Sequence, residues 1–310
     1  MKLKKFLSAL AISLASLASP AAASTNFDIS LPFPTDKVYV LSRPKTATAP
    51  PLASNIAGAH ALPVSLQLST ESKSGFVCDF GFNYDLEWGT YESGQSFPDS
   101  FSKINREFEV NVGKRSEKDA AKTRYGFLLN LFGADYRTDS GISGLHAFNE
   151  KMRSGIGLAN DLISSDRFLI RTTLRYLYEN ADEGLDIFKS NYRLDGIEAK
   201  VSSKMIFKIF SGSVPTDEAS RANPAIMLVL RPEVYTRFTR GGNVYNEQGT
   251  KVLLESYFNK ILGGKLGILT GFSYSRTAAG NNPFLLRNGE NLSRSLELLV
   301  GVSTEILNTP

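Results

Sequence analysis

The sequence predicts an all-β chain that folds as a transmembrane antiparallel up-and-down β-barrel of about ten strands, with twelve as the alternative. Stretches in which apolar and polar residues alternate recur along the chain, as in strands with one apolar and one polar face. The single cysteine excludes an internal disulfide, and after residue 23 no apolar run approaches the roughly 20 residues of a membrane helix. Because only helices and closed barrels satisfy the backbone in lipid, a membrane protein with these features is a barrel.

Residues 1–23 have the pattern of a secretory signal peptide. Lys2, Lys4 and Lys5 precede a short apolar core, and three alanines ending at Ala23 supply the small residues of a cleavage site. The formal net charge of +4 includes these three lysines, so the chain after residue 23 carries 4 − 3 = +1. A charge this small gives no reason to expect nucleic acid as a partner.

Residues 24–72 differ from the rest of the chain in their proline content. Proline withholds a backbone donor and resists both helices and central strands. We therefore predict a periplasmic N-terminal arm over 24–72 and a barrel over 73–310. The prolines of the arm are Pro32, Pro34, Pro44, Pro50, Pro51 and Pro63.

The segment 76–88 is the predicted first barrel strand. Its even positions are all apolar or aromatic, and its odd positions after Val77 are Asp, Gly, Asn or Glu. Side chains alternate between the two faces of a strand, so one face is apolar and the other is acidic and polar. We expect the apolar face to meet lipid and the acidic face to meet a polar lumen.

The same alternation recurs in nine later segments, which gives ten in total, an even number as single-chain bacterial barrels require. One segment changes phase at Asp195–Gly196, where a β-bulge would restore the faces. The nine segments are 104–112, 123–135, 155–162, 167–179, 192–209, 226–237, 251–259, 265–274 and 292–306.

The connections between segments alternate in length, which indicates a periplasmic end with short turns and an extracellular end with long loops. The connection 211–222 is longer than this rule predicts, so twelve strands stay open, with either part of 24–72 or a split of 190–210 supplying the extra ones. The short connections are 114–120, 164–165 and 263–264; the predicted extracellular loops are 91–100, 138–151, 181–191, 241–249 and 278–290.

With its alternating segments and sorted connections, the chain resembles Gram-negative outer-membrane β-barrels over about residues 73–307. The resemblance implies location in the outer membrane, contact with its lipid and lipopolysaccharide, and insertion by the barrel-insertion machinery. Such barrels usually end on an aromatic residue, whereas this chain ends Leu307-Asn308-Thr309-Pro310. Aromatic residues near the outer strand ends fit an interfacial belt; they are Trp88, Tyr136, Tyr176, Tyr178 and Tyr274.

Charged residues on the polar face are the candidate functional site. A small barrel leaves little interior space, so the function we expect is a narrow or plugged channel for small polar solutes. A ladder of ion pairs that only fills the lumen is the structural alternative. The predicted lumen-lining and selectivity residues are Asp79, Asp85, Glu87, Arg124, Arg167, Arg171 and Arg175.

Other functions remain as alternatives. A non-transporting structural or adhesion barrel would act through its extracellular loops. A lipid-acting enzyme would need a catalytic histidine, and His146 is the candidate, although it falls in a predicted loop that cannot hold a triad rigid. Because His146 has no such support, we expect no enzyme activity. The sequence holds no Cys/His cluster, so we also expect no metal and no cofactor.

Overall fold

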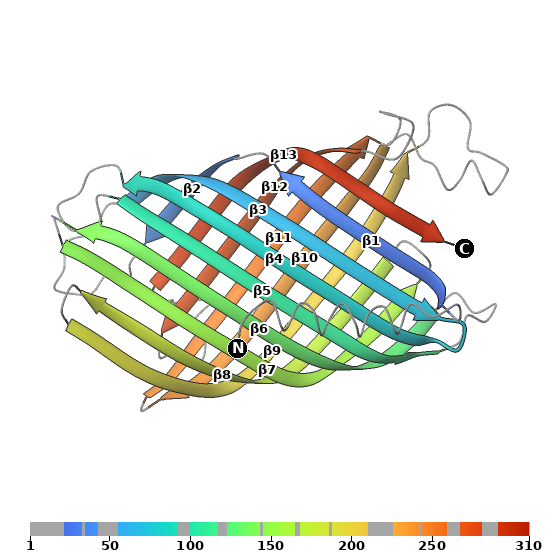
Figure 1. Cartoon of the computed structure of the whole chain (residues 1–310), viewed down its shortest axis with the longest axis horizontal. Helices are drawn as coiled ribbons and strands as arrows, with labels where there is room; N and C mark the ends of the chain where they lie inside the picture. The colour runs from blue at the N-terminus through green and yellow to red at the C-terminus, as the bar shows by residue number, and fades with distance from the viewer. Residues whose placement is uncertain are drawn as a thin grey trace.

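In the computed structural model, the described residues form thirteen antiparallel strands in one sheet (Figure 1). From β2 to β13, each strand pairs with the next one along the chain, which is up-and-down order. No helix within the described ranges is long and apolar enough to cross a membrane. The structure describes residues 22–32, 35–42, 55–91, 100–116, 123–142, 145–164, 168–185, 188–209, 226–241, 243–258, 267–280 and 291–309.

The strand bounds are as follows: β1 (Ala22–Pro32), β2 (Thr35–Ser42), β3 (Asn55–Ser72), β4 (Phe76–Tyr91), β5 (Ser100–Arg115), β6 (Thr123–Ile142), β7 (Leu145–Ser164), β8 (Phe168–Leu185), β9 (Phe188–Ile209), β10 (Ile226–Gly241), β11 (Asn243–Phe258), β12 (Gly267–Gly280) and β13 (Asn291–Thr309).

The sheet closes into a barrel because β1 and β2 lie end to end in a single position. Both pair with β13 on one side and with β3 on the other. Thirteen described strands therefore occupy twelve positions of a ring. The predicted up-and-down transmembrane barrel is confirmed, and the alternative count of twelve is the one that the structure gives.

The segment 24–72 lies largely within the barrel wall, so the predicted periplasmic arm is wrong where the structure describes it. Pro32 ends β1 and Pro63 lies within β3, so these two prolines do not prevent strands. Ser30 pairs with Ser65 and Thr35 pairs with Ala61, which places Pro63 of β3 opposite the break between β1 and β2. Proline lacks an N–H, so it is tolerated at such a break. The first predicted strand, 76–88, is accordingly β4.

Three predicted extracellular loops are largely strand. β6 continues to Ile142 and β7 begins at Leu145, and the same continuation occurs between β8 and β9 and between β10 and β11. Beyond the lipid both faces of a hairpin meet water, so the alternation of side chains is lost while the backbone pairing continues. Polar composition over 138–151, 181–191 and 241–249 therefore did not mark strand ends.

The bulge predicted at Asp195–Gly196 is also wrong, because β9 keeps one register with β8 throughout their pairing, from Phe168↔Met205 to Leu185↔Phe188. Asp195 is exposed on the outer face, where its carboxylate accepts a hydrogen bond from the Tyr176 hydroxyl at 3.3 Å. The shift in the alternation of apolar and polar residues therefore marks the point along β9 at which the outer face becomes polar.

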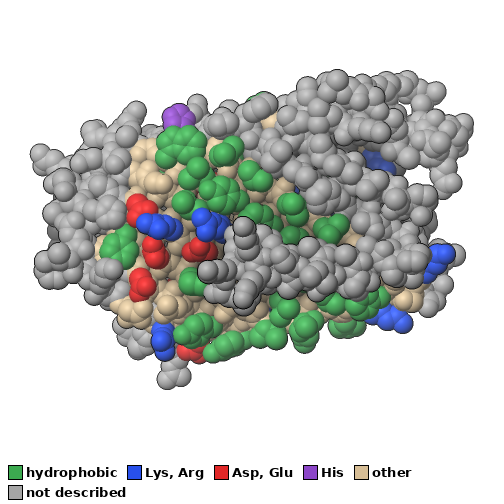
Figure 2. All heavy atoms as spheres, in the orientation of Figure 1, with side chains coloured by type: hydrophobic (Ala, Val, Ile, Leu, Met, Phe, Trp, Pro, Cys, Tyr) green, Lys and Arg blue, Asp and Glu red, His purple; other side chains and the backbone are tan. Residues whose placement is uncertain are grey.

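Large apolar side chains cover the outer face of the described strands, as Figure 2 shows for one side of the molecule. On adjacent strands Phe127 is 76% exposed, Leu158 70% and Leu174 60%. Apolar side chains on an outward face are what a lipid-embedded barrel requires.

Aromatic residues on the outer face test the predicted belt. Trp88, Tyr176 and Tyr178 are exposed there, as predicted. Tyr136 instead points inward and donates a hydrogen bond to Glu107 at 2.6 Å, so its assignment to the belt is wrong.

Candidate functional site: the charged barrel interior

Inward-facing positions are distinguished by strand parity and burial. On β8 Leu174 is exposed on the outer face, whereas Thr173 and Arg175 on the other face are 3% and 4% exposed. Charged side chains from most of the described strands converge in this interior. They form two groups, one near the end with the short turns and one further along the barrel.

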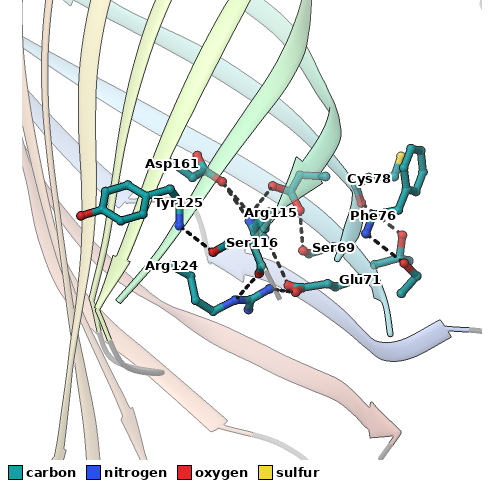
Figure 3. A network of polar contacts seen from close by, with 12 residues as sticks. Ser69, Glu71, Phe76, Cys78, Arg115, Ser116, Arg124, Tyr125 and Asp161 are labelled. Carbon is teal, nitrogen blue, oxygen red and sulfur yellow. Dashed lines mark hydrogen bonds and ion pairs between the residues drawn. The ribbon is translucent and has the colours of Figure 1, made fainter. Parts of the chain in front are cut away.

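The turn-end cluster is built around a square of two arginines and two aspartates, part of which is drawn in Figure 3. Arg115 donates to Asp161 at 2.8 Å and to Asp79 at 3.0 Å. Arg171 reaches the same two carboxylates at 2.6 Å and 2.5 Å. Ser69 donates a further hydrogen bond to Asp79 at 2.5 Å. The charged members of the turn-end cluster are Glu71, Asp79, Arg115, Arg124, Asp161 and Arg171.

The β3–β4 hairpin holds Arg115 in place. Gly75 closes the turn, with its N–H bonded to the Ser72 carbonyl at 3.0 Å, and its φ of 78° lies in the left-handed region that favours glycine. The Arg115 N–H then donates to the Gly75 carbonyl at 2.7 Å. A Cβ at this glycine would lie 2.3 Å from the Arg115 carbonyl oxygen, so a larger residue would displace the arginine.

The second group, the central cluster, links β5, β7, β8, β9, β10 and β11. Lys200 donates to Glu109 at 2.8 Å, and Arg237 donates to Glu198 at 2.9 Å and to Glu247 at 2.8 Å. Every charged side chain of the cluster has a partner of opposite sign. Its members are Glu109, Arg153, Arg175, Glu179, Glu198, Lys200, Arg237 and Glu247.

Several of these contacts span the lumen. Asp79 lies on β4 and Arg171 on β8, and three strands separate β4 from β8 along the wall. Lys200 of β9 reaches Glu109 of β5 in the same way. Neighbouring strands lie only about 4.8 Å apart, so contacts over four strand positions run through the interior. The barrel is therefore narrow where the clusters lie.

Apolar side chains fill the space beside the charges. Leu128 is 1% exposed and packs against Val77 of β4 by lying across Gly113, where an added Cβ would meet the Leu128 Cα at 2.8 Å. Further along, the Arg175 guanidinium lies 3.7 Å from the centre of the Phe132 ring. A buried guanidinium against an aromatic face gains a cation–π attraction. This side of the interior is packed like a protein core.

The charges of both clusters balance. The turn-end cluster holds three arginines and three carboxylates. The central cluster holds four cations and four carboxylates. Such compensation stabilises buried charges and leaves little net field for selecting ions.

The predicted lumen residues are placed as follows. Asp79, Arg124 and Arg171 belong to the turn-end cluster, and Arg175 belongs to the central cluster. Glu87 is fully buried, and its carboxylate lies 3.6 Å from the ammonium group of Lys103 on the adjacent strand. Asp85 lies on β4 opposite Asn105. Arg167 lies outside the described residues.

The sequence analysis missed half of the turn-end cluster and most of the central cluster. Arg115 was assigned to a turn, although it is the last residue of β5. Glu71 lay in the segment predicted as an arm. Asp161 could have been found from the sequence, because it shares strand parity with the polar face of its segment. The apolar inward residues Leu128, Phe132 and Leu177 could not, because polar lumen faces were expected to stay polar.

One part of the interior differs from the packed side. Gln67, Asn83 and Lys251 are exposed although their strand positions face inward. Asn83 accepts a hydrogen bond from the Ser65 hydroxyl at 3.0 Å. Arg231 of β10 reaches the Gln67 amide oxygen of β3 at 3.4 Å, which again crosses the lumen.

The two histidines lie on two different strands, His60 on β3 and His146 on β7. His146 lies in β7 opposite Gly141, not in a loop as predicted. The ring of His60 lies 5.7 Å from the ring of Trp88 at the outer face. No group of three or more His, Cys, Asp or Glu in the part that the structure describes could hold a metal ion.

Comparisons with known proteins give structural matches only. Neither a protein-family model nor the sequence of a curated protein matches the chain. The translocator domain of the autotransporter NalP from Neisseria meningitidis is 8% identical, with a TM-score of 0.49, covering 98% of this chain and 96% of that one. A Pseudomonas aeruginosa FadL homologue is 8% identical at a TM-score of 0.43, covering 92% and 91%.

The outer membrane protease OmpT from Escherichia coli is also similar, at 8% identity and a TM-score of 0.34, covering 92% of this chain and 97% of that one. These proteins are outer-membrane β-barrels with different roles. In this chain the described strands form a closed up-and-down barrel of twelve positions with an apolar outer face.

Proposed function

We propose that this outer-membrane β-barrel is a narrow channel for small polar solutes, constricted by the turn-end and central clusters. The observation that carries the proposal is the set of ion pairs that cross the lumen, from β4 to β8 and from β5 to β9. Barrels of about eight strands are filled by their own side chains, and those of 16–18 leave a wide channel. A twelve-position barrel with a partly packed interior fits a small bore between these limits.

Single-channel recording tests the proposal. The purified protein, refolded into a planar bilayer, should give small discrete conductance steps. Its folded state should be checked by heat-modifiable mobility on a gel. Silent bilayers with an intact barrel would exclude a channel.

A second candidate is a barrel that transports nothing and acts through its extracellular hairpins. The balanced charge of both clusters favours it, because a fully compensated interior serves stability without any passing solute. Deleting 138–151 or 278–290 would then abolish function in cells and leave any conductance unchanged.

Export by the signal peptide, contact with lipopolysaccharide and use of the barrel-insertion machinery complete the proposal. A fusion of residues 1–30 to a periplasmic reporter would test export directly. Retention of the reporter in the cytoplasm would contradict it.

A further inference from the structure

The exposed inward-facing residues lie at mid-barrel, away from the packed side. Asn83 shares strand parity with Asp79, and Lys251 with Glu247, and both acidic residues join the interior clusters. Gln67 pairs with Gly81, between the inward positions 79 and 83. These three residues face the lumen and are nonetheless open to water.

The contact between Arg231 of β10 and Gln67 of β3 crosses the lumen beside these exposed residues. Ser65 of β3 and Asn83 of β4 lie on neighbouring strands and are joined by a hydrogen bond of 3.0 Å.

We propose that a water-filled pathway runs past Gln67, Asn83 and Lys251 and admits small uncharged hydroxylated solutes of sugar size. The proposal rests on the proposed channel function and names its route and its solute class. Amide and hydroxyl groups at Ser65, Gln67 and Asn83 both donate and accept hydrogen bonds, which suits a hydroxylated solute. Arg231 is neutralised by Glu255 at 2.8 Å, so it adds little net charge to the route.

Cysteine labelling tests the route without any transport assay. Cys78 is the single cysteine, so Cys78→Ser gives a cysteine-free background. In that background Asn83→Cys should react rapidly with a membrane-impermeant methanethiosulfonate. Asn130→Cys is the matched control, because Asn130 also faces inward but is 0% exposed within the packed side. Equal labelling of the two positions would overturn the pathway.

Liposome swelling tests the solute class. Vesicles containing the wild type should swell in a neutral hexose faster than in its cationic amino analogue. Asn83→Trp should reduce hexose entry roughly tenfold by narrowing the route, since a pore that side chains nearly fill responds to each added ring. Phe82→Trp, on the outer face of the same strand, is the control and should swell like the wild type.

The outcomes separate the two proposals. If Asn83→Cys is labelled but the wild type admits no solute, the channel function fails and the solute class fails with it. If hexose enters and Asn83→Trp does not slow it, the channel stands and the proposed route is overturned.

Discussion

Asn130 and Asn83 face the same barrel interior from opposite kinds of surroundings. Asn130 is fully buried and donates to Glu109 and Asn111, both at 2.7 Å. Asn83 is exposed to water beside Ser65. The barrel wall is equally regular at both positions, so the difference comes from what the neighbouring strands project into the lumen. Glu109 and Asn111 close over Asn130, whereas the short side chain of Ser65 leaves Asn83 open to water.

The largest expected effect is a loss of stability caused by a substitution on the packed side. Asp161→Ala removes the carboxylate between Arg115 and Arg171 and leaves two buried guanidiniums that repel each other. Breaking a buried pair in this way costs about 3–5 kcal/mol, so the free energy of unfolding in urea should fall by that amount.

The matched control is Asp135→Ala, since Asp135 pairs with Arg106 on the outer face and both are about half exposed. An exposed pair contributes less than about 1 kcal/mol. Equal losses for Asp161→Ala and Asp135→Ala would mean that the interior is not a core.

A smaller loss of stability should follow the removal of one interior hydrogen bond. Tyr136→Phe leaves Glu107 without the hydroxyl that donates to it at 2.6 Å. A hydrogen bond to a charged group contributes about 1.5–3 kcal/mol, which the same unfolding measurement would detect. Tyr178→Phe on the outer face is the control, and a loss as large as that of Tyr136→Phe would contradict the assignment of Tyr136 to the interior.

Removing two interior side chains from the packed side should raise the single-channel conductance. The double variant Arg175→Ala with Glu198→Ala removes two long side chains of opposite charge, which are 4% and 1% exposed. We expect roughly a twofold larger single-channel conductance, since interior side chains set the bore of a small barrel. The pair Arg106→Ala with Asp135→Ala changes the same charges on the outer face. An increase in this control would show that the bore is not the cause.

The smallest expected effect is a change in ion selectivity caused by a substitution at Lys251. Lys251 is exposed, so Lys251→Glu should shift the anion-to-cation permeability ratio towards cations by about twofold or less. Reversal potentials under a salt gradient measure this ratio. Lys200→Gln with Glu109→Gln is the control, because these charges neutralise each other at 2.8 Å within the packed side. No shift in Lys251→Glu would remove Lys251 from the conducting route.

The barrel could be predicted from the sequence because lipid imposes strict alternation on each strand. Phe127 and Leu129 on β6 follow the rule and were placed correctly. Outside the lipid the rule no longer applies, so the ends of the hairpins were missed. The strands β1 to β3 lie in the barrel wall and were missed because of their proline content. Proline content misled the prediction at Pro63, which the break between β1 and β2 accommodates.

The site could be predicted only in part. Parity places Asp79 and Arg171 inside, but which charges meet depends on the distance between facing strands across the lumen. That distance is a property of the closed ring and not of any one strand. Arg115 became the hub of its cluster through the neighbouring Gly75 turn, which no alternation pattern encodes.

The end-to-end arrangement of β1 and β2 has a consequence for how the cylinder assembles. Thr25 pairs with Thr309, 309 − 25 = 284 residues later, so closure is the longest-range step of folding. Long-range pairing is slow because chain entropy is lost before contacts form. Because β1 and β2 share one position of the ring, each of the two strands can pair with β13 independently. Neither strand has to wait for the other to find its register.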